Sequence, residues 1–377
     1  MHIVHLTNAY SPRSGGVRTT AHALGRGYRE RGHDLTLVVP GPQAREGAHV
    51  WGTLVQLRGP AVPGTGGYRA LLDRDALRRT LDRLAPDRLE VSDRFTMRHL
   101  GGWARSAGVP AVLLAHERLD GILRTTGHLP APLARAAADR HNRGTAAAFP
   151  TVVATTRFAA QEFDRIGVAT TLVPLGVDLV EFQPGGPAGR AEDGHGAGPM
   201  PVPVLVLCSR LSPEKRPDLA VEALRLLVAD GTSARLVVAG DGPAMAGLRR
   251  RASGLPVTFL GHVPDRRAVA ELLAGADVVL APGPIETLGL AALEALACGT
   301  PVVASRTSAL AELLTDGSGA CAEPTARGVA AAVATLLAQP AAHGRRAARE
   351  RAEQFPWSRT VDAMLAVHTA PTAGAVR

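Results

Sequence analysis

Long apolar runs and paired cysteines are missing from this 377-residue sequence. No segment approaches the roughly 20 consecutive apolar residues that a membrane-spanning helix needs. The first residues, MHIVHLTNAY, also lack the basic and apolar regions of a signal peptide. The three cysteines, Cys208, Cys298 and Cys321, are far apart and belong to no CxxC or Cys/His cluster, which argues against a disulfide framework and a zinc site. We therefore expect a cytoplasmic protein that at most rests peripherally on the inner face of the plasma membrane.

Lysine is almost absent as well. Of 42 basic residues, Lys215 is the only lysine, so arginine supplies the other 41. The net charge of +8 and the isoelectric point of about 10.5 permit anionic partners. The arginines are spread along the whole chain, so we do not expect the protein to bind nucleic acid. We expect its anionic partner to be a phosphorylated ligand or an acidic lipid surface. Lys215 suggests a site that needs a compact, mobile ammonium in place of a planar guanidinium.

Short β-branched or leucine-rich runs alternate with longer amphipathic stretches through most of the chain. The runs predicted as buried parallel strands are HIVHLT, DLTLVVP, AVLLA and TVVATT in the first half, and VLVLCS, ARLVVAG, VTFLG, DVVLAP and PVVAS in the second. The helical patterns cover 17–31, 218–229, 244–252, 266–274 and 288–298. This alternation predicts right-handed βαβ units and a doubly wound α/β fold.

The alternation breaks at residues 184–203, where six glycines and five prolines stand among 20 residues. This composition excludes a helix or a central strand and predicts a mobile linker. The same pattern resumes on both sides, so we expect two Rossmann-like parallel-sheet domains, 1–183 and 204–355, facing across a cleft. Ligands of such sheets bind at the carboxyl ends of the strands, so site residues should directly follow strands.

Two strand-to-helix loops carry residues suited to a phosphate. Gly15 and Gly16 precede a helix, and the exposed amides of a helix start favour an anion, although the pair could simply make a turn. Arg210 and Lys215 follow strand VLVLCS, and Pro217 suits the first position of the next helix. Arg210 can fork onto a phosphate while Lys215 adds a mobile charge; the alternative is a solvated basic loop.

The segment GPIETLGLAALEALACGTPVVAS, residues 283–305, is the most informative part of the sequence. Glu286 precedes a short predicted helix and Glu294 lies inside it, about 12 Å further along an ideal helix axis. A carboxylate accepts hydrogen bonds from two hydroxyls, which suits a sugar and a ribose. The amides of Gly289 and Leu290 lie between the two glutamates and suit a phosphate. The alternative is a solvated helix face.

His116 ends the predicted strand AVLLA and should lie at the same edge of the first sheet. A histidine there can hydrogen-bond a sugar hydroxyl or stabilise developing charge, or it can be a structural edge residue. The turn GDGP, residues 240–243, is more typical of structure than of catalysis. No Asp-x-Asp pair follows a strand and the His/Cys spacing does not match a ligand set, so we expect no metal and no other cofactor.

Taken together, these residues resemble the family-4 retaining glycosyltransferases of the GT-B fold. The shared features are an early GGV, a histidine after a first-domain strand, R-x4-K, GDGP, and E-x7-E within ETLGLAALEALACGTPVV. The resemblance runs from residue 1 to about residue 368 and closes with FPWSRTVDAMLAVH. Within the family, GGVRTTAHALG, LEVSDRFTMRHLG and AHERLDGIL are most similar to the actinobacterial GDP-mannose-dependent phosphatidylinositol dimannoside α-(1→6)-mannosyltransferases. Thr287, where glycine is common, and Glu117, where aspartate is common, depart from the broad family pattern.

The resemblance implies a nucleotide-sugar donor, GDP-mannose, and an anionic glycolipid acceptor. It also implies that helix 356–370 crosses back to the first domain. Configuration would be retained without a protein nucleophile, because the leaving phosphate oxygen deprotonates the acceptor. The implied roles are diphosphate binding by Arg210 and Lys215, sugar binding by Glu286 with Thr287 beside it, phosphate binding by Gly289 and Leu290, ribose binding by Glu294, and donor contacts from Gly15, Gly16 and His116.

The sequence gives weaker signals for the acceptor site. Tyr10, Arg18, Asp93 and Arg94 follow strands of the first domain and are candidates for contacting a polyol headgroup. Segment 67–88 is arginine-rich and amphipathic, so it either lies on anionic lipid or forms an ordinary surface helix with salt bridges.

Three other functions compete with this prediction. A dinucleotide oxidoreductase would need G-x-G-x-x-G after a strand, and SGGVRTT lacks that spacing. A nucleotide-sugar-binding regulator of the same fold would be expected to have lost some of Arg210, Lys215, Glu286 and Glu294, which are all present. The same chemistry could also act on a soluble or natural-product acceptor or use another nucleotide sugar.

Overall fold

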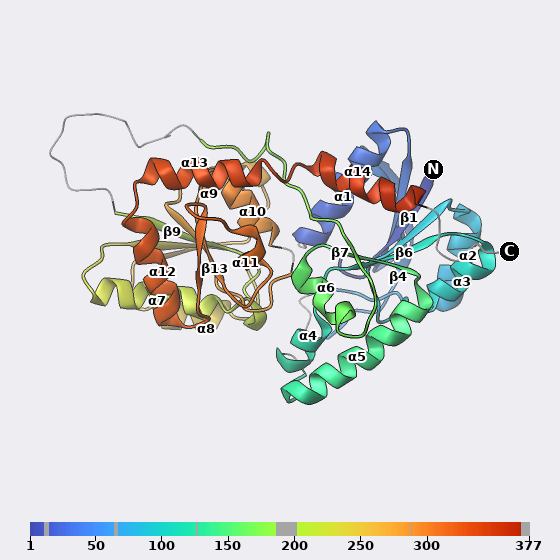
Figure 1. Ribbon diagram of the computed structural model, residues 1–377, viewed down its shortest axis with the longest axis horizontal. Helices are drawn as coiled ribbons and strands as arrows, with labels where there is room; N and C mark the ends of the chain where they lie inside the picture. The colour runs from blue at the N-terminus through green and yellow to red at the C-terminus, as the bar shows by residue number, and fades with distance from the viewer. Residues whose placement is uncertain (11–14, 64–66, 126, 186–201, 288, 371–377) are drawn as a thin grey trace. The chain divides into compact units, whose positions relative to one another are not determined.

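A computed structural model describes residues 1–10, 15–63, 67–125, 127–185, 202–287 and 289–370 (Figure 1). The chain forms two compact units, each built around its own sheet. The first unit holds Met1–Leu175 and the segment that begins at Trp357, and the second holds Gly176–Pro356. The fold is α/β in both units, as the alternating pattern predicts.

The first unit contains an eight-stranded sheet in the order β3-β4-β2-β1-β5-β6-β7-β8. Its pairs are parallel except β3 with β4, which are antiparallel at one edge. The central strands are buried on both faces, which is why they are continuous apolar runs rather than alternating patterns. The strands are β1 His2–Leu6, β2 Asp34–Gly41, β3 Arg45–His49, β4 Gly52–Arg58, β5 Arg88–Val91, β6 Ala111–Ala115, β7 Thr151–Ala154 and β8 Thr171–Leu172.

Seven helices are described around this sheet, and the last comes from the far end of the sequence. They are α1 Gly16–Glu30, α2 Arg74–Leu84, α3 Leu100–Ala107, α4 Leu119–Thr125, α5 Ala131–Ala148, α6 Arg157–Asp164 and α14 Trp357–Thr369. Helix α14 packs along α1, as Figure 1 shows. The contact is close because a Cβ at Gly27 would lie 2.4 Å from Val361 Cγ2. Glycine at position 27 therefore lets the two helices approach.

The second unit contains a six-stranded parallel sheet in the order β11-β10-β9-β12-β13-β14. The strands are β9 Val204–Cys208, β10 Arg235–Ala239, β11 Val257–Gly261, β12 Val278–Ala281, β13 Val302–Ser305 and β14 Gly319–Ala322. The helical segments are η1 Pro213–Lys215, α7 Pro217–Ala229, α8 Met245–Arg251, α9 Arg266–Ala274, α10 Leu290–Ala297, α11 Leu310–Leu313, α12 Ala326–Leu337 and α13 Ala341–Ala352. The strand order reverses between β9 and β12, the position where doubly wound sheets bind ligands.

The units divide earlier in the chain than the expected domain boundary at residue 183. Residues 176–183 belong to the second unit, because Val177 and Phe182 are buried in its core. The Val177 amide also donates to the Phe355 carbonyl at 2.8 Å. Most of the expected linker 184–203 lies outside the described residues. The helix expected over 356–370 corresponds to α14 and belongs to the first unit.

Helix α2 occupies the middle of segment 67–88, for which lipid contact was one of two interpretations. Leu77 and Leu81 on its apolar side are buried in the core of the first unit. Its exposed side carries charged residues, including Arg78 and Arg79. The helix is therefore unable to insert an apolar face into a membrane while it is packed in this way. Across the described residues, no helix has both the length and the apolar character needed to cross a bilayer.

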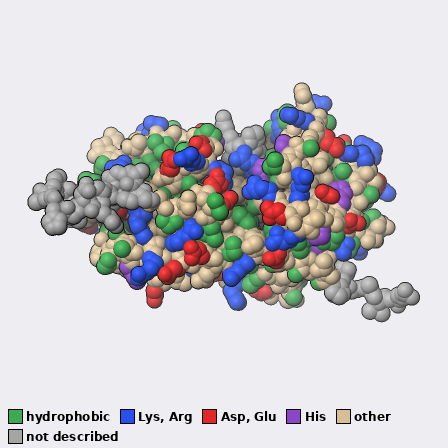
Figure 2. Space-filling model, turned by 90° about the horizontal axis from the view of Figure 1, so that it is seen from above, with side chains coloured by type: hydrophobic (Ala, Val, Ile, Leu, Met, Phe, Trp, Pro, Cys, Tyr) green, Lys and Arg blue, Asp and Glu red, His purple; other side chains and the backbone are tan. Residues whose placement is uncertain are grey.

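Charged side chains of both signs alternate over the face of the molecule seen in Figure 2. This distribution agrees with a sequence in which 42 basic and 34 acidic residues are dispersed rather than clustered.

Candidate active site

The loop after β9 holds Arg210 and Lys215, the two residues predicted to bind the diphosphate. Arg210 is exposed, and its carbonyl accepts a hydrogen bond from the Ser212 amide at 3.0 Å. The loop then forms η1, which ends at Lys215, and Arg216 adopts a left-handed conformation with φ of 48°. Helix α7 begins at Pro217, the predicted first helical position. A short, well-defined turn thus places Lys215 directly ahead of the helix.

The loop after β12 leads into α10 through Gly289. This residue is the N-cap and has φ of 61°, which favours glycine. A Cβ here would lie 2.0 Å from Leu310 Cδ2, so space also requires glycine. The Gly289 amide donates to Glu286 Oε1 at 3.4 Å. The predicted sugar-binding carboxylate therefore lies at the positive end of the helix that carries Leu290 at its first position.

Lys215 and Glu286 contact each other although 71 residues separate them in the sequence. Lys215 Nζ donates to Glu286 Oε2, and the two side chains are 28% and 19% exposed. Each residue follows one of the two strands at which the sheet order reverses. The packing is close, since a Cβ at Gly283 would lie 3.1 Å from Lys215 Cα. A cation, a carboxylate and helix-end amides therefore gather at one edge of the second sheet.

Glu294 lies within α10, and its side chain is only 14% exposed. Burial raises the pKa of this carboxyl to about 7, although the charge of Arg266 acts to lower it. Thr287, next to Glu286, is also buried. The E-x7-E spacing thus places one carboxylate before the helix and one inside it, in different environments.

The turn after β10 supports the loop that carries Arg210. Gly240 has φ of 136°, and a Cβ at this position would lie 1.9 Å from the Ser209 carbonyl oxygen. The Leu211 amide donates to the Asp241 carbonyl at 3.0 Å. The GDGP turn is therefore a packing element that fixes the neighbouring loop, in agreement with the structural role expected for it.

In the first unit, the predicted phosphate-binding glycines begin α1. Gly15 is the N-cap of this helix and is exposed, and no side chain of the described residues caps the helix start. A Cβ at Gly15 would meet no atom of the described residues within 4 Å. The part of the chain that the structure describes therefore does not cover Gly15.

His116 follows β6, as predicted, and is 8% exposed. Its Nε2 lies 3.0 Å from the Ser92 carbonyl oxygen. The Ser92 hydroxyl in turn lies 2.8 Å from His5 Nε2. A hydrogen-bonded chain from the neighbouring strands therefore fixes the orientation of the predicted mannose-binding histidine.

The four acceptor candidates separate into two kinds. Tyr10 is half-buried, and its hydroxyl lies 3.1 Å from His22 Nε2. Burial raises the pKa of Tyr10 while the charge of Arg18 acts to lower it, so these two candidates share one region of the first unit. Asp93 instead holds its own turn, because its Oδ1 accepts from the Phe95 and Thr96 amides at 2.9 and 2.7 Å.

Arg94 corrects the sequence-based prediction. The residue is 4% exposed, and its guanidinium donates to Glu162 Oε2 at 3.2 Å and to the Glu117 carbonyl at 2.7 Å. Glu162 also accepts from the Leu119 and Asp120 amides at 3.0 and 2.7 Å. Arg94 is therefore a buried support for the chain that follows His116, and it is not placed to contact an acceptor directly.

Both halves of the chain match profiles of known glycosyltransferase families. The Glycosyltransferase Family 4 profile matches residues 14–181, and the profile of Glycosyl transferases group 1 matches residues 202–339. A GDP-mannose-dependent α-(1-6)-phosphatidylinositol dimannoside mannosyltransferase from Mycobacterium tuberculosis is 52% identical over 371 residues, which cover 97% of this chain and 95% of that protein. The chain belongs to glycosyltransferase family 4.

Other relatives of this family-4 glycosyltransferase differ in their named acceptor. A D-inositol 3-phosphate glycosyltransferase from Saccharomonospora viridis is 32% identical over 292 residues, 71% of this chain and 66% of that protein. Among solved structures, sucrose-phosphate synthase from Thermosynechococcus elongatus aligns with a TM-score of 0.77 at 20% identity, covering 97% and 98% of the two chains. HepE from Anabaena with UDP-glucose aligns with a TM-score of 0.74 at 18% identity, covering 98% and 100%. These structures share the GT-B fold of this glycosyltransferase.

Several polar residues of this glycosyltransferase escaped the sequence analysis. His22 and His49 each stack on Trp51, at centroid distances of 4.4 and 4.9 Å. Glu90 is fully buried in β5 and bonded to two histidines. A charged residue between Leu89 and Val91 of a buried strand is a signal that could have pointed to Glu90. The stacking of His22 and His49 depends on the fold and leaves no mark in sequence.

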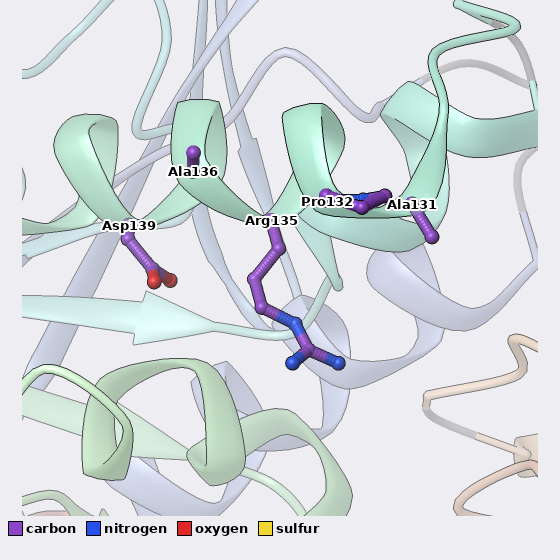
Figure 3. A pocket seen from close by; sticks show the side chains of 5 residues that line it. All are labelled: Ala131, Pro132, Arg135, Ala136 and Asp139. Atoms are coloured by element: carbon purple, nitrogen blue, oxygen red, sulfur yellow. The ribbon is translucent and has the colours of Figure 1, made fainter.

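A surface pocket of about 350 Å³ lies along α5 of this glycosyltransferase. Figure 3 shows its lining, which comes from α5 alone and includes Arg135 and Asp139. Asp139 Oδ1 accepts from Arg165 Nε at 2.8 Å. None of the predicted site residues lines this pocket, so we assign it no role. Among the described histidines, cysteines and carboxylates, no group of three could hold a metal ion.

Proposed function

We propose that this glycosyltransferase moves mannose from GDP-mannose to a phosphatidylinositol mannoside, forms an α-1,6 linkage and retains the configuration of the sugar. The observation that carries the proposal is the 52% identity, over nearly the whole of both chains, to a mannosyltransferase of that name. The contact between Lys215 and Glu286 supports it, because the residue that binds the diphosphate and the residue that binds the sugar must lie within one donor site.

The second unit supplies the donor contacts in this proposal. Arg210 and Lys215 bind the diphosphate, and the amides of Gly289 and Leu290 bind a phosphate at the start of α10. Glu286 binds the sugar hydroxyls beside Thr287. Glu294 accepts hydrogen bonds from the ribose.

The first unit supplies further donor contacts and the acceptor contacts. Gly15 and Gly16 offer amides at the start of α1, and His116 faces the mannose. Tyr10 and Arg18 are the acceptor contacts we retain. Asp93 has an indirect role, because its carboxylate is committed to holding a turn.

The bond between mannose C1 and the diphosphate oxygen breaks, and the leaving GDP takes the bonding electron pair. The acceptor hydroxyl attacks C1 from the same face and transfers its proton to the departing phosphate oxygen. The cations of Arg210 and Lys215 stabilise the charge that develops on that phosphate. We propose no metal and no other cofactor for this step, because two cations and a helix start supply the positive charge.

A lipid acceptor would place this enzyme at the cytoplasmic surface of a membrane as a peripheral protein. The exposed arginines of α2, such as Arg78 and Arg79, would attract anionic headgroups. The apolar side of α2 is buried, so this attraction would be electrostatic and would weaken with salt.

A soluble inositol phosphate is the second candidate acceptor, because a relative that is 32% identical over 71% of this chain is named for D-inositol 3-phosphate. The donor site and the chemistry would be unchanged. The two acceptors share an inositol ring, and inositol 3-phosphate lacks both the lipid and the mannoses of phosphatidylinositol dimannoside.

The test combines three donors with two acceptors. Purified protein is incubated with GDP-mannose, UDP-glucose or UDP-N-acetylglucosamine, together with vesicles containing phosphatidylinositol dimannoside, with inositol 3-phosphate, or with neither. We expect nucleotide release only with GDP-mannose and the vesicles, and a lipid product heavier by one hexose with an α-1,6 linkage by NMR. Turnover with inositol 3-phosphate would favour the second candidate. Binding of GDP-mannose without turnover on any acceptor would contradict the proposed mannosyl transfer and favour a nucleotide-sugar-binding regulator.

A further inference from the structure

Arg266, at the start of α9, connects Glu294 to a second carboxylate. Its Nη1 lies 3.6 Å from Glu294 Oε1, and its Nε donates to Glu181 Oε2 at 2.7 Å. The guanidinium carbon also lies 4.9 Å from the centre of the Phe182 ring. Glu181 and Phe182 therefore hold the guanidinium in place, and a further nitrogen faces the predicted ribose ligand.

The surroundings of Glu294 disfavour its ionised form. Burial raises the pKa of this carboxyl to about 7, Arg266 lowers it and Glu181 raises it. Glu294 also acts on two thiols, Cys208 at the end of β9 and Cys298 directly after α10, and burial raises the pKa of each thiol to about 12. Both thiols are therefore neutral near pH 7. Among the described residues, Arg266 is thus a cation whose charge favours the ionised form of Glu294.

Ionisation of Glu294 matters because a ribose presents two neighbouring hydroxyls. An ionised carboxylate can accept a hydrogen bond from each of them, whereas a protonated carboxyl uses one oxygen as a donor. Hydrogen bonds to a charged acceptor are also shorter and roughly twice as strong as neutral ones.

We propose that Arg266 is a positioning residue that favours the ionised form of Glu294 and orients it for the ribose diol of the donor nucleotide. Glu181 holds Arg266 in the geometry that this requires. The inference rests on the proposed function, in which Glu294 binds the ribose. It adds a residue outside the R-x4-K and E-x7-E motifs to the determinants of nucleotide affinity.

The experiment measures binding of GDP and of 2′,3′-dideoxy-GDP by calorimetry at pH 7. The proteins are the wild type and the variants Arg266→Gln, Glu294→Gln and Arg267→Gln. Arg267 is the matched control, because it is the next residue, loses the same charge, and pairs with Glu271 at the surface with 85% of its side chain exposed. Thermal unfolding of each variant confirms that it is folded.

We expect Arg266→Gln to weaken GDP about tenfold, the scale of one charge-assisted hydrogen bond, and to change the affinity for the dideoxy nucleotide little. Arg267→Gln should bind both nucleotides like the wild type. At pH 8.5 the defect of Arg266→Gln should shrink, because a larger fraction of Glu294 is ionised there than at pH 7, with or without Arg266. The terminal phosphate of GDP also titrates near pH 6 to 7, so Glu294→Gln serves as the reference for the pH dependence.

The inference would be overturned if Arg266→Gln lost the same affinity for both nucleotides. It would also be overturned if Arg267→Gln weakened GDP binding as much as Arg266→Gln does. If Glu294→Gln discriminates the two nucleotides and Arg266→Gln does not, Arg266 has no such role and the proposed ribose contact stands. If Glu294→Gln weakens both nucleotides equally, the ribose contact itself is wrong and the inference fails with it.

Discussion

Glu90 Oε1 and His368 Nε2 lie 2.7 Å apart in the first unit, although 278 residues separate them in the sequence. Both side chains are fully buried. Glu90 also accepts from the Tyr28 hydroxyl at 2.7 Å and lies 2.7 Å from His5 Nδ1. A single carboxylate in β5 thus joins α1, β1 and the returning helix α14.

Glu90→Gln should lower the free energy of unfolding at pH 7 by about 3 kcal/mol, the scale for breaking a buried charged pair. Burial alone would raise the pKa of Glu90, but hydrogen bonds from His368 and His5 and their charge hold it well below its usual value. The stabilisation is therefore complete above the unfolded pKa of about 4.3 and is lost as the pH falls below it. Urea unfolding from pH 7 to pH 3 should show the gap between variant and wild type narrowing.

The control for this prediction is Asp362→Asn, also on α14. Asp362 pairs with Arg31 at 2.7 Å, but its side chain is 62% exposed, so the substitution should change stability by less than about 1 kcal/mol. A similar loss in both variants would mean that the buried network contributes nothing beyond an ordinary surface contact.

Lys215→Ala should lower turnover with GDP-mannose by about 100-fold or more, the usual scale for a lost electrostatic contact to a transition state. Lys215→Arg should recover little, because a planar fork replaces a compact ammonium in the turn against Glu286. Initial rates of GDP release provide the measurement. Arg216→Gln is the neighbouring control, since Arg216 is paired with Asp218 at 2.9 Å. Wild-type turnover in Lys215→Ala would refute the role of this lysine.

Gly289→Ala should lower the melting temperature and weaken GDP binding together. The new methyl group would collide with Leu310, and the backbone would be held at φ of 61°. The double variant Gly289→Ala/Leu310→Ala should relieve the collision but remain less stable than the wild type. The left-handed backbone conformation alone costs about 1–2 kcal/mol, and the shortened side chain at Leu310 leaves a cavity. Calorimetric titration with GDP and a thermal melt test this. If Gly289→Ala melts and binds like the wild type, α10 does not begin with the geometry described above.

Arg94→Met should reduce thermal stability and turnover more than acceptor affinity. The substitution leaves the buried carboxylate of Glu162 without its guanidinium partner, which disturbs the start of α4 and the neighbouring His116. Measurements of kcat and KM for the acceptor, with a thermal melt, separate the two roles. A raised KM alone, with unchanged melting, would restore Arg94 as a direct acceptor contact.

The sequence predicted the parts of the fold that depend on local apolar runs. Most of the buried central strands were readable as continuous apolar runs, but β5 Arg88–Val91, which is also central, contains two charged residues and was not predicted. The sequence also predicted that site residues directly follow strands, and Lys215 meets Glu286 because such residues of neighbouring parallel strands lie at one sheet edge. The β3–β4 hairpin was missed, because Arg45–His49 is largely exposed and has no apolar alternation.

Burial of charged residues was the part that could not be predicted. Arg94 follows a strand just as Arg210 does, yet one is buried and the other exposed. The difference arises from Glu162, whose position depends on how α6 packs. The pairing of Arg266 with Glu181 joins segments 85 residues apart, and charge patterns over that separation carry no local signal.

The return of α14 has a consequence for synthesis of the protein. Strands β1 and β5 leave the ribosome early, but His368 emerges only after the whole second unit has been translated. Until then Glu90 lacks one of its partners and α1 lacks the helix that covers it. The unit that is made first therefore completes its folding last, and a nascent chain stalled before Trp357 would leave the surface of α1 that α14 covers exposed.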